Sequence, residues 1–546
     1  MSNGQWATDL ETVRVFHEQT KHGGQHDRSR LRAFRPLDPA NRPEAFKRYP
    51  GVQTLPLPTD LGESSLSAGE VLSGGASSLA RSLELDLLAR LLFFSAGVTR
   101  QATRAQSYFR TAMSAGNLHP IEVYVVNGDV AGLAAGVHHF APLEFGLTTL
   151  RVGDYRPVLA DAAADPDLAA VPALLVLTGI PWWTGWKYGE RGFRHLYWDA
   201  GTMLANTLSV GDGAGIPARV RLAFADRLVS RLLGLDGVEE FPLALVAVGR
   251  AGESSSAADV VSVPPLQLEV APLSANPLEF PLVTETQSAG QLDSSDVASW
   301  RERAAALLSE AASASIAPAN RLERQSIESL ILRRGSTRLM RREPVREEAL
   351  GWAMAAASRP VSGDFTAADG SLLEHYLSVH AVEGVTSGTY RWKARQLVRL
   401  RSGDFRGQAQ QLCLDQPLGG DSAYTVFHCT DLGHVLDALG ARGYRAAHLE
   451  AGIAAGRLQL AAFALGLGGT GLTFFDDAVS GFFATRAACL LVTSVGVPEY
   501  RSRPGGLPRQ PAELRSFDDL MVRLGDRLRT KSWFAGQWLD DPPLSA

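Results

Sequence analysis

The chain has 546 residues and a mass of 58.5 kDa, more than one hydrophobic core usually supports, so at least two domains are expected. Its 53 basic and 58 acidic residues leave a net charge of −5, which gives no electrostatic reason to expect nucleic acid or an acidic membrane surface as a partner. No apolar run approaches the length of a membrane span, and the N-terminus lacks the apolar core of a signal peptide, so the expected location is the cytoplasm. Three widely spaced cysteines predict neither a disulfide framework nor a metal site.

Two stretches of the chain show little regular pattern. Residues 1–80 are interrupted by prolines, and we interpret them as an N-terminal extension that could cap a substrate site. Residues 251–319 contain the Ser-, Pro- and Ala-rich segment AGESSSAADVVSVPPLQ, which predicts a linker. These stretches border two candidate domains, at 81–250 and 320–546.

Each candidate domain shows the same order of elements. The first has an apolar strand at Ile121, a second at Ala173 and, after a long apolar helix, a closing strand at Ala244. The corresponding strands of the second domain start at Leu373, Ala423 and Cys489. Near-continuous apolar runs indicate buried strands, and a period of about 3.6 residues indicates helices. The pattern predicts an α+β fold in which a sheet is layered with helices.

Short motifs recur between the two domains at offsets of 250 or 251 residues. The matched positions, first copy before second, are 191–194 with 442–445, Gly201 with Gly452, Phe224 with Phe474, and Asp226 with Asp476. An ordered series of such matches predicts two copies of one domain. A feature present in only one copy then points to function rather than to the fold.

The first such feature is the loop Arg-Thr-Ala-Met-Ser-Ala-Gly-Asn-Leu-His-Pro at 110–120. At an offset of 252 the second copy lacks its Ser, Gly, Asn and Pro. A loop of small residues ending in Asn can offer backbone N–H groups and a carboxamide to a planar polar ligand, which makes Ser114, Gly116 and Asn117 candidate binding residues. The alternative is a turn in which Asn and Pro serve local geometry.

The second feature is a basic cluster that opens copy two, where residues 333–338 read Arg-Arg-Gly-Ser-Thr-Arg. The matching stretch of copy one, near Gly74–Leu79, has no such cluster. Forked guanidinium groups with a hydroxyl suit a phosphate. The candidate phosphate ligands are Arg333, Arg334, Ser336 and Arg338. The alternative is a solvated basic face at a domain start.

The third feature is the pair Lys187 and Tyr188, opposite which copy two has Ala438 and Leu439. A Lys ammonium beside a Tyr phenol can take part in proton transfer where partial burial lowers a pKa. The alternative is a surface pair on a helix. The segment Gly466–Gly471 fits G-x-G-x-x-G by letter, but it follows a helix rather than a strand and so is not a dinucleotide fingerprint.

Together these motifs resemble the flavin-dependent nitroreductase superfamily, and more closely its SagB-type dehydrogenases. The loop at 114–117 is similar to the superfamily's Pro-Ser-x-x-Asn loop, and residues 187–194 nearly match the SagB-type motif Lys-Tyr-Gly-Glu-Arg-Gly-Tyr-Arg. Residues 333–338 resemble the superfamily's Arg-Arg-Ser-x-Arg segment, and 466–471 resemble its helix-end glycine loop. The departures are Met113 where Pro is usual and His119 where many nitroreductases have Gln.

The resemblance implies a two-fold architecture with flavin mononucleotide (FMN) at the interface. The tandem copies would then form an intramolecular pseudo-dimer, as a monomer or within a higher homo-oligomer. One composite site would join the arginine cluster, Gly468 and Gly469 of copy two to the 114–117 loop of copy one, and would hold one FMN. The opposite site would hold none. Arg501 and Arg503, after the last strand, would add to phosphate binding.

The resemblance also implies a reaction. An azoline or related amino-acid-derived group would be dehydrogenated, with Lys187 or Tyr188 removing a proton while hydride moves to FMN. The substrate would be a small molecule or a peptide, free or bound to a carrier or leader. Two alternatives stay open: an NAD(P)H-dependent nitro-, quinone- or enone reductase, and a non-catalytic flavin-binding or storage protein.

Overall fold

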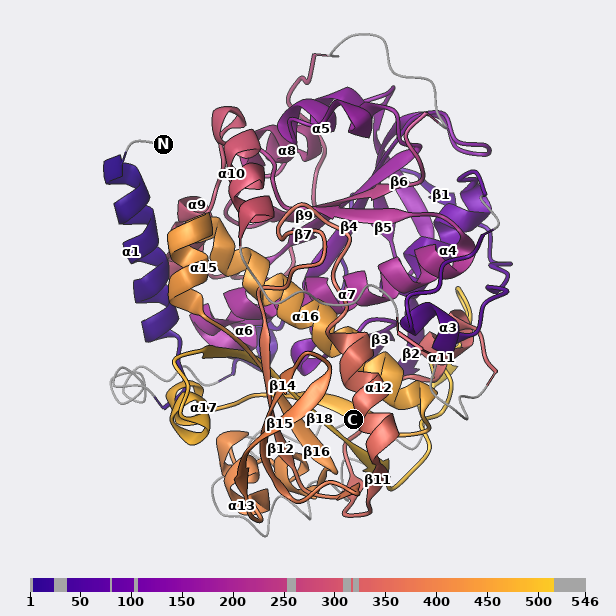
Figure 1. Ribbon diagram of the computed structural model, residues 1–546. Coiled ribbons are helices and arrows are strands. Elements are labelled where there is room, and N and C mark those ends of the chain that lie inside the picture. Colours follow the sequence, from indigo (N-terminus) through magenta and orange to yellow (C-terminus); the bar gives the residue numbers. More distant parts are fainter. Residues whose placement is uncertain are drawn as a thin grey trace.

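The structure is a computed structural model that describes residues 3–23, 37–78, 81–102, 107–252, 262–307, 316–317 and 324–514. Each half of the chain contributes one seven-stranded sheet, and the long helices α7 (Gly192–Ala214) and α16 (Ala441–Ala464) lie between the two sheets (Figure 1). The predicted α+β architecture in two copies is confirmed.

The sheet of the first half has the strand order β1-β6-β5-β4-β7-β9-β8. Its central strands β4 and β7 pair antiparallel and are buried throughout, as the apolar runs predict. The elements of this half are α4 (Leu85–Ala96), β2 (Val98–Ala102), β3 (Ser107–Arg110), β4 (Ile121–Asn127), β5 (Gly136–Ala141), β6 (Gly146–Val152), α5 (Arg156–Ala162), β7 (Ala173–Gly179), α6 (Pro181–Tyr188), α7, β8 (Ala218–Arg221), α8 (Asp226–Leu233) and β9 (Phe241–Val248).

The sheet of the second half has the order β10-β18-β16-β12-β14-β15, and β17 also pairs with β18. The antiparallel pair β12 and β16 takes the place of β4 and β7. The elements of this half are α11 (Ile327–Arg333), β10 (Met340–Arg341), β11 (Val345–Arg346), α12 (Glu347–Ala357), β12 (Glu374–Val379), β13 (Val382–Glu383), β14 (Gly388–Lys393), β15 (Gln396–Ser402), α13 (Arg406–Leu412), α14 (Leu418–Asp421), β16 (Tyr424–Thr430), α15 (Leu432–Leu439), α16, β17 (Gly468–Leu472), α17 (Asp476–Phe483) and β18 (Ala488–Pro498).

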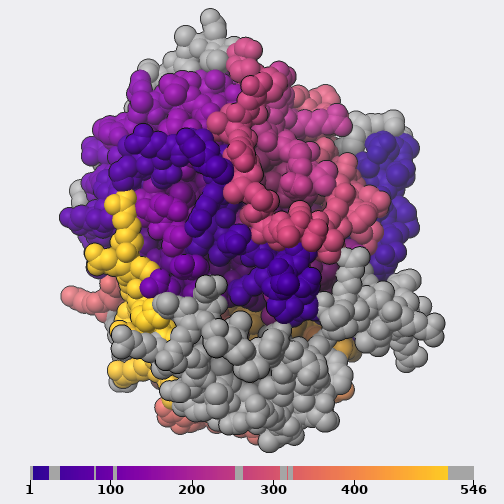
Figure 2. Space-filling model, turned by 180° about the vertical axis from the view of Figure 1, so that it is seen from behind, coloured from indigo at the N-terminus to yellow at the C-terminus, as the bar shows by residue number. Residues whose placement is uncertain are grey.

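The segments outside the two domains also carry regular structure. The extension contains α1 (Asn3–Gln19), β1 (Thr54–Pro56) and α3 (Ala68–Leu72), and the stretch predicted as a linker contains α9 (Pro281–Ala289) and α10 (Ser294–Ala306). After β18 the chain crosses to the first half, where β19 (Ala512–Glu513) pairs with β2; its surface path is seen from behind in yellow (Figure 2). Among the described residues, no helix has the length and apolar character needed to cross a bilayer.

The two long helices meet backbone to backbone at the glycines that the repeat pairs. Every residue of α16, and every residue of α7 except Asp212, is buried. A Cβ on Gly201 would lie 2.3 Å from the Leu449 carbonyl oxygen, and a Cβ on Gly452 would lie 2.4 Å from the Trp198 carbonyl oxygen. Because equivalent positions face each other, the contact is of the kind that a two-fold axis produces.

Two buried ion-pair clusters join the halves, and each consists of one aspartate from one half and two arginines from the other. The pairs are Asp476 with Arg191 (2.9 Å) and Arg194 (2.7 Å), and Asp226 with Arg442 (2.6 Å) and Arg445 (2.9 Å). Burial alone would raise the pKa of Asp476, but the two arginine charges outweigh burial and hold that pKa well below its ordinary value. The repeated motifs at 191–194, 442–445, 226 and 476 therefore form the interface between the copies.

The helix that precedes each domain closes one cluster. After α1, the backbone N–H of His22 donates to Asp476 at 2.9 Å, and Arg194 donates to the His17 carbonyl at 2.8 Å. After α9, the backbone N–H of Leu292 donates to Asp226 at 3.0 Å, and Arg442 donates to the Gly290 carbonyl at 3.0 Å. The extension and the interdomain stretch thus make matching contributions, although their sequences are not visibly related.

Asp476→Asn should destabilise the protein strongly, because it leaves the buried guanidinium groups of Arg191 and Arg194 without a countercharge. Breaking a buried pair in this way costs about 3–5 kcal/mol, and the midpoint of urea unfolding should fall accordingly. The control is Asp437→Asn, which removes an exposed partner of Arg14 and should cost less than about 1 kcal/mol. Equal midpoints for the two variants would contradict a structural role for the Asp476 cluster.

Candidate active site at the seam between the halves

The loop at 114–117 follows β3 and is held by its own polar groups. Gly116 and Asn117 have left-handed φ values of 65° and 58°, which favour glycine and asparagine. The Asn117 carboxamide donates to the Tyr108 carbonyl at 2.9 Å and faces His119 Nε2 at 2.9 Å. Both ends of this carboxamide are engaged within the first half, as the turn interpretation expects, and a direct role of Asn117 toward a ligand stays a prediction.

A buried carboxyl of α7 anchors the same loop. The Ser114 hydroxyl donates to Asp199 at 2.5 Å, and the Ala115 N–H donates to the other oxygen of Asp199 at 3.2 Å. The Ser114 hydroxyl oxygen in turn accepts from the His119 N–H at 2.8 Å. Burial raises the pKa of Asp199 to about 7 against the opposing effect of these two hydrogen bonds. The sequence analysis missed Asp199, because an acid within an apolar helix carries no motif.

Lys187 and Tyr188 end α6 and lie against this loop. A Cβ on Gly116 would come 2.7 Å from the Tyr188 hydroxyl and 3.3 Å from Lys187 Cδ, so only glycine fits there without displacing them. Both side chains are half-buried. Burial, and then the charge of Asp199, raise the pKa of Tyr188, while the charge of Arg338 opposes them. A residue of the second half therefore lies within electrostatic reach of the Lys-Tyr pair of the first.

The arginine cluster also reaches across the seam. The buried Arg334 donates through Nη2 to the Thr111 carbonyl of the first half at 2.9 Å. Its Nη1 has no hydrogen-bond partner among the residues that the structure describes. In the opposite direction, Arg100 on β2 donates to the carbonyls of Arg334 at 3.2 Å and Arg503 at 2.9 Å. Arg100 was not among the predicted site residues, because its strand, Val-Thr-Arg-Gln-Ala, carries no motif that marks it.

The glycine loop packs on the arginine cluster. The Thr337 N–H donates to the Gly469 carbonyl at 3.0 Å, and a Cβ on Gly468 would lie 2.4 Å from the Thr337 hydroxyl. Gln459 lies next to Gly469, since a Cβ on Gly469 would be 3.1 Å from Gln459 Cγ. Within the described part of the chain, the buried Oε1 of Gln459 has no hydrogen-bond partner. Its Nε2 contacts the Met113 sulfur at 2.5 Å. The seam thus holds an unpaired acceptor as well as the unpaired donor on Arg334.

The remaining predicted residues lie at the margin. Arg333 donates to the Phe463 carbonyl at 2.9 Å, and Ser336 is half-buried. Arg501 and Arg503 are exposed, and Arg503 donates to the Glu513 carbonyl at 3.1 Å. It is the backbone carbonyl of Arg503, and not its side chain, that faces the arginine cluster, where it accepts from Arg100. Phosphate binding by these four side chains stays a prediction.

The opposite seam repeats the anchoring acid but not the cluster. Glu450, which matches Asp199 at an offset of 251, accepts from the Ser371 hydroxyl at 2.6 Å and from the Leu372 N–H at 2.8 Å. Ser371 therefore takes the part of Ser114, although the residue matched by offset is not a serine. Burial raises the pKa of Glu450 to about 7.

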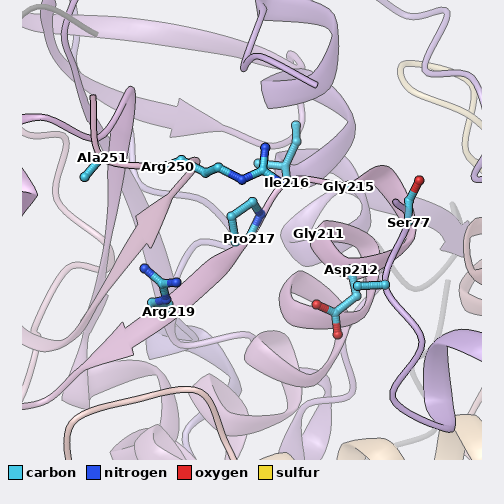
Figure 3. Close-up of a pocket in the computed structure, with 10 residues that line it drawn as sticks. Ser77, Gly211, Asp212, Gly215, Ile216, Pro217, Arg219, Arg250 and Ala251 are labelled. Atoms are coloured by element: carbon cyan, nitrogen blue, oxygen red, sulfur yellow. The ribbon is translucent and has the colours of Figure 1, made fainter. Parts of the chain in front are cut away.

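A cavity of about 380 Å³ lies at the end of α7, where the first half places Gly215 in the position of Gly466 (Figure 3). Its walls include Ser77, Asp212 and Arg219. Of the described residues that line it, Arg219 and Arg250 are arginines, and they do not form a run like that at 333–338. That the opposite site holds no flavin stays a prediction.

Known proteins resemble the chain over both halves. The nitroreductase family model matches residues 80–250 and 331–495, more than half of the chain. The "Putative nitroreductase MJ1384" of Methanocaldococcus jannaschii is 30% identical over 169 residues, which are 31% of this chain and 81% of that protein. The crystal structure of a "putative nitroreductase" from Anabaena variabilis aligns with a TM-score of 0.70 and 25% identity, over 89% of this chain and 99% of that one.

A third structure is more distant. The E. coli microcin synthetase McbBCD, solved with truncated pro-MccB17 bound, aligns with a TM-score of 0.28 and 22% identity, over 46% of this chain and 98% of that one. A likeness at this level carries no argument about function. The family match on both halves, with the Anabaena structure spanning most of the chain, confirms the predicted tandem arrangement.

Asp199 and Glu450 should make the stability of the protein fall as pH rises. Their folded pKa values of about 7 lie above those of an unfolded chain, so their contribution is complete below about pH 4 and is lost as pH rises through 7. The two acids together should cost about 5 kcal/mol of unfolding free energy between pH 5 and 8, and Asp199→Asn combined with Glu450→Gln should abolish this pH dependence. Thermal unfolding between pH 5 and 8 measures it, and an unchanged slope would contradict the burial of these acids.

Proposed function

Since the chain belongs to the nitroreductase family, whose members are FMN-dependent oxidoreductases, we propose that it is an FMN-dependent dehydrogenase. Its substrate is an azoline or a related amino-acid-derived group in peptide natural-product biosynthesis. The observation that carries the proposal is the position of Lys187 and Tyr188 against Gly116, with Arg338 of the other half within electrostatic reach. A simple hydride relay needs no such pair, whereas a dehydrogenation must also remove a proton.

The residues at the seam fit FMN. The Nη1 of Arg334, which has no partner among the described residues, would supply a buried cationic donor for a phosphate. The Oε1 of Gln459, which likewise has no partner among them, would supply an acceptor for an N–H of a polar ring. Gly468 and Gly469 keep the adjoining wall free of side chains. When bound, FMN would supply a two-electron acceptor that takes hydride from a substrate carbon and is reoxidised by dioxygen.

The chain's own residues handle the proton. As hydride leaves one substrate atom, Lys187 or Tyr188 takes a proton from the neighbouring atom. The electron pair that bound this proton then forms the new double bond between the two atoms. The loop at 114–117 and α6 hold the pair in place, because Asp199 anchors the loop and Gly116 contacts both side chains. The positions of the two side chains can therefore be fixed before substrate binds, as efficient proton removal requires.

Anaerobic mixing tests the reaction class. Bleaching of the flavin by an azoline peptide alone supports the dehydrogenase. Bleaching by NADPH alone would instead support the nitro-, quinone- or enone reductase. A bound flavin that no donor bleaches would support storage, and a protein that takes up no flavin would contradict all three functions.

Lys187→Ala and Tyr188→Phe should each lower dehydrogenation at least 100-fold while FMN remains bound, because each removes a proton-transfer group without touching the phosphate arginines. Turnover of the azoline peptide and the visible flavin spectrum are measured on the same samples. Trp392→Phe, on β14 of the second half, serves as a folding control. Unchanged turnover in both variants would remove the pair from the mechanism.

Arg334→Ala combined with Arg338→Ala should release FMN, because it deletes two cationic groups that we assign to the phosphate; the loss expected is at least 100-fold in affinity. A matched control is Arg341→Ala with Arg342→Ala, since these neighbouring arginines pair with Glu343 at 3.2 Å and Asp421 at 2.8 Å on the surface. Full flavin content in the first double variant would refute the phosphate assignment.

A further inference from the structure

Asp199 contacts the start of the 114–117 loop, and its charge also acts on Tyr188. Its two oxygens take hydrogen bonds from the Ser114 hydroxyl and the Ala115 N–H, so it fixes both the side chain and the backbone at the start of the loop. Its side chain is 5% exposed, and these are its two described hydrogen-bond donors. A carboxyl held this way has little freedom to move away from the loop.

The same carboxyl bears on Tyr188. The loop touches the Tyr188 hydroxyl at Gly116, two residues from Ser114, and the Asp199 charge acts on the phenol from α7. The charged group that opposes it is Arg338, from the segment after α11. A phenol at its ordinary pKa already keeps its proton at neutral pH, and burial and the Asp199 charge raise the pKa of Tyr188 further.

We propose that Asp199 is a positioning residue, which holds the 114–117 loop so that Gly116 lies against the Tyr188 hydroxyl and Lys187. That this placement serves proton transfer rests on the proposed function. The hold of Asp199 on the loop and its effect on Tyr188 do not, and they can be measured in protein without flavin.

The chain contains its own control for this proposal. Glu450 is the counterpart of Asp199 on α16, and it accepts from Ser371 and Leu372 in the same pattern. The stretch opposite Lys187 and Tyr188 in the second half holds Ala438 and Leu439, so Glu450 has no phenol of this kind to act on. Asp199→Asn and Glu450→Gln therefore alter equivalent structural contacts, and only Asp199→Asn removes the proposed effect on Tyr188.

The first measurement is the ionisation of Tyr188. 3-Fluorotyrosine at position 188, whose phenol ionises at lower pH than tyrosine, allows titration by fluorine NMR in flavin-free protein. Asp199→Asn should move this titration to lower pH, Glu450→Gln should leave it in place, and Asp199→Glu should restore it, because glutamate performs the same anchoring in the other half. An identical Tyr188 titration in wild type and Asp199→Asn would overturn the proposal.

The second measurement is the affinity for FMN, followed by flavin fluorescence. Asp199→Asn should weaken binding about tenfold, through loss of a charge-assisted anchor of the loop, while Glu450→Gln should change it less than twofold. Should Asp199→Asn fail to fold, Ser114→Ala breaks the same contact from the loop side, with Ser371→Ala as its control. Equal weakening by each variant and its control would assign Asp199 to the fold alone and refute a positioning role.

The two proposals fail in different ways. If wild-type protein takes up no flavin, the proposed function is wrong, and the fluorine titration still decides whether Asp199 governs Tyr188. If flavin binds and the azoline peptide bleaches it, but Asp199→Asn leaves the pH of the Tyr188 titration unchanged, the positioning proposal alone is wrong.

Discussion

The arrangement of the two halves depends on the aspartate–arginine clusters at Asp476 and Asp226. A buried carboxylate or guanidinium is costly unless its charge is matched, and in both clusters the aspartate is matched by arginines of the opposite half. Separating the halves would leave these buried charges without those partners, so the clusters favour the docked arrangement. Together with the close approach of Gly201 and Gly452, the clusters fix how α7 lies against α16, and hence what meets at each seam.

Carrying both halves in one chain lets the two seams differ. In a symmetric dimer of identical chains, a substitution at one seam appears at the other as well. In this chain the Arg334 guanidinium reaches across one seam to the Thr111 carbonyl. At the opposite seam, the C-terminal end of α7 borders a cavity beside Asp212. The clusters that hold the halves together are conserved in pattern between the copies, and the residues that line the seams are not. The duplication therefore separates the demands of docking from those of chemistry.

The sequence was informative where the two copies kept the same residue types at the same spacing. The motifs around Arg191 and Asp226 could be paired with those around Arg442 and Asp476 by their letters alone. That each arginine pair binds the aspartate of the opposite copy could not be read from spacing, since the same letters allow pairing within one copy. Ser371 escaped notice because it lies 257 residues after Ser114 rather than 251, although its hydroxyl makes the equivalent contact. Arg100 has no motif and gains its meaning only from the carbonyls beside it.

The carboxyls of Asp199 and Glu450 show how a carboxyl that the fold requires can come to lie beside a side chain that takes part in chemistry. Both are buried, both anchor the start of a loop, and for both burial raises the pKa to about 7. Since the anchoring occurs in both halves, it belongs to the fold. The phenol of Tyr188 occurs at one seam only, so the field of an acid that the fold already requires acts there on a group able to exchange a proton. A site built in this way needs no further buried charge, because the cost of desolvating the acid is already part of the stability of each half.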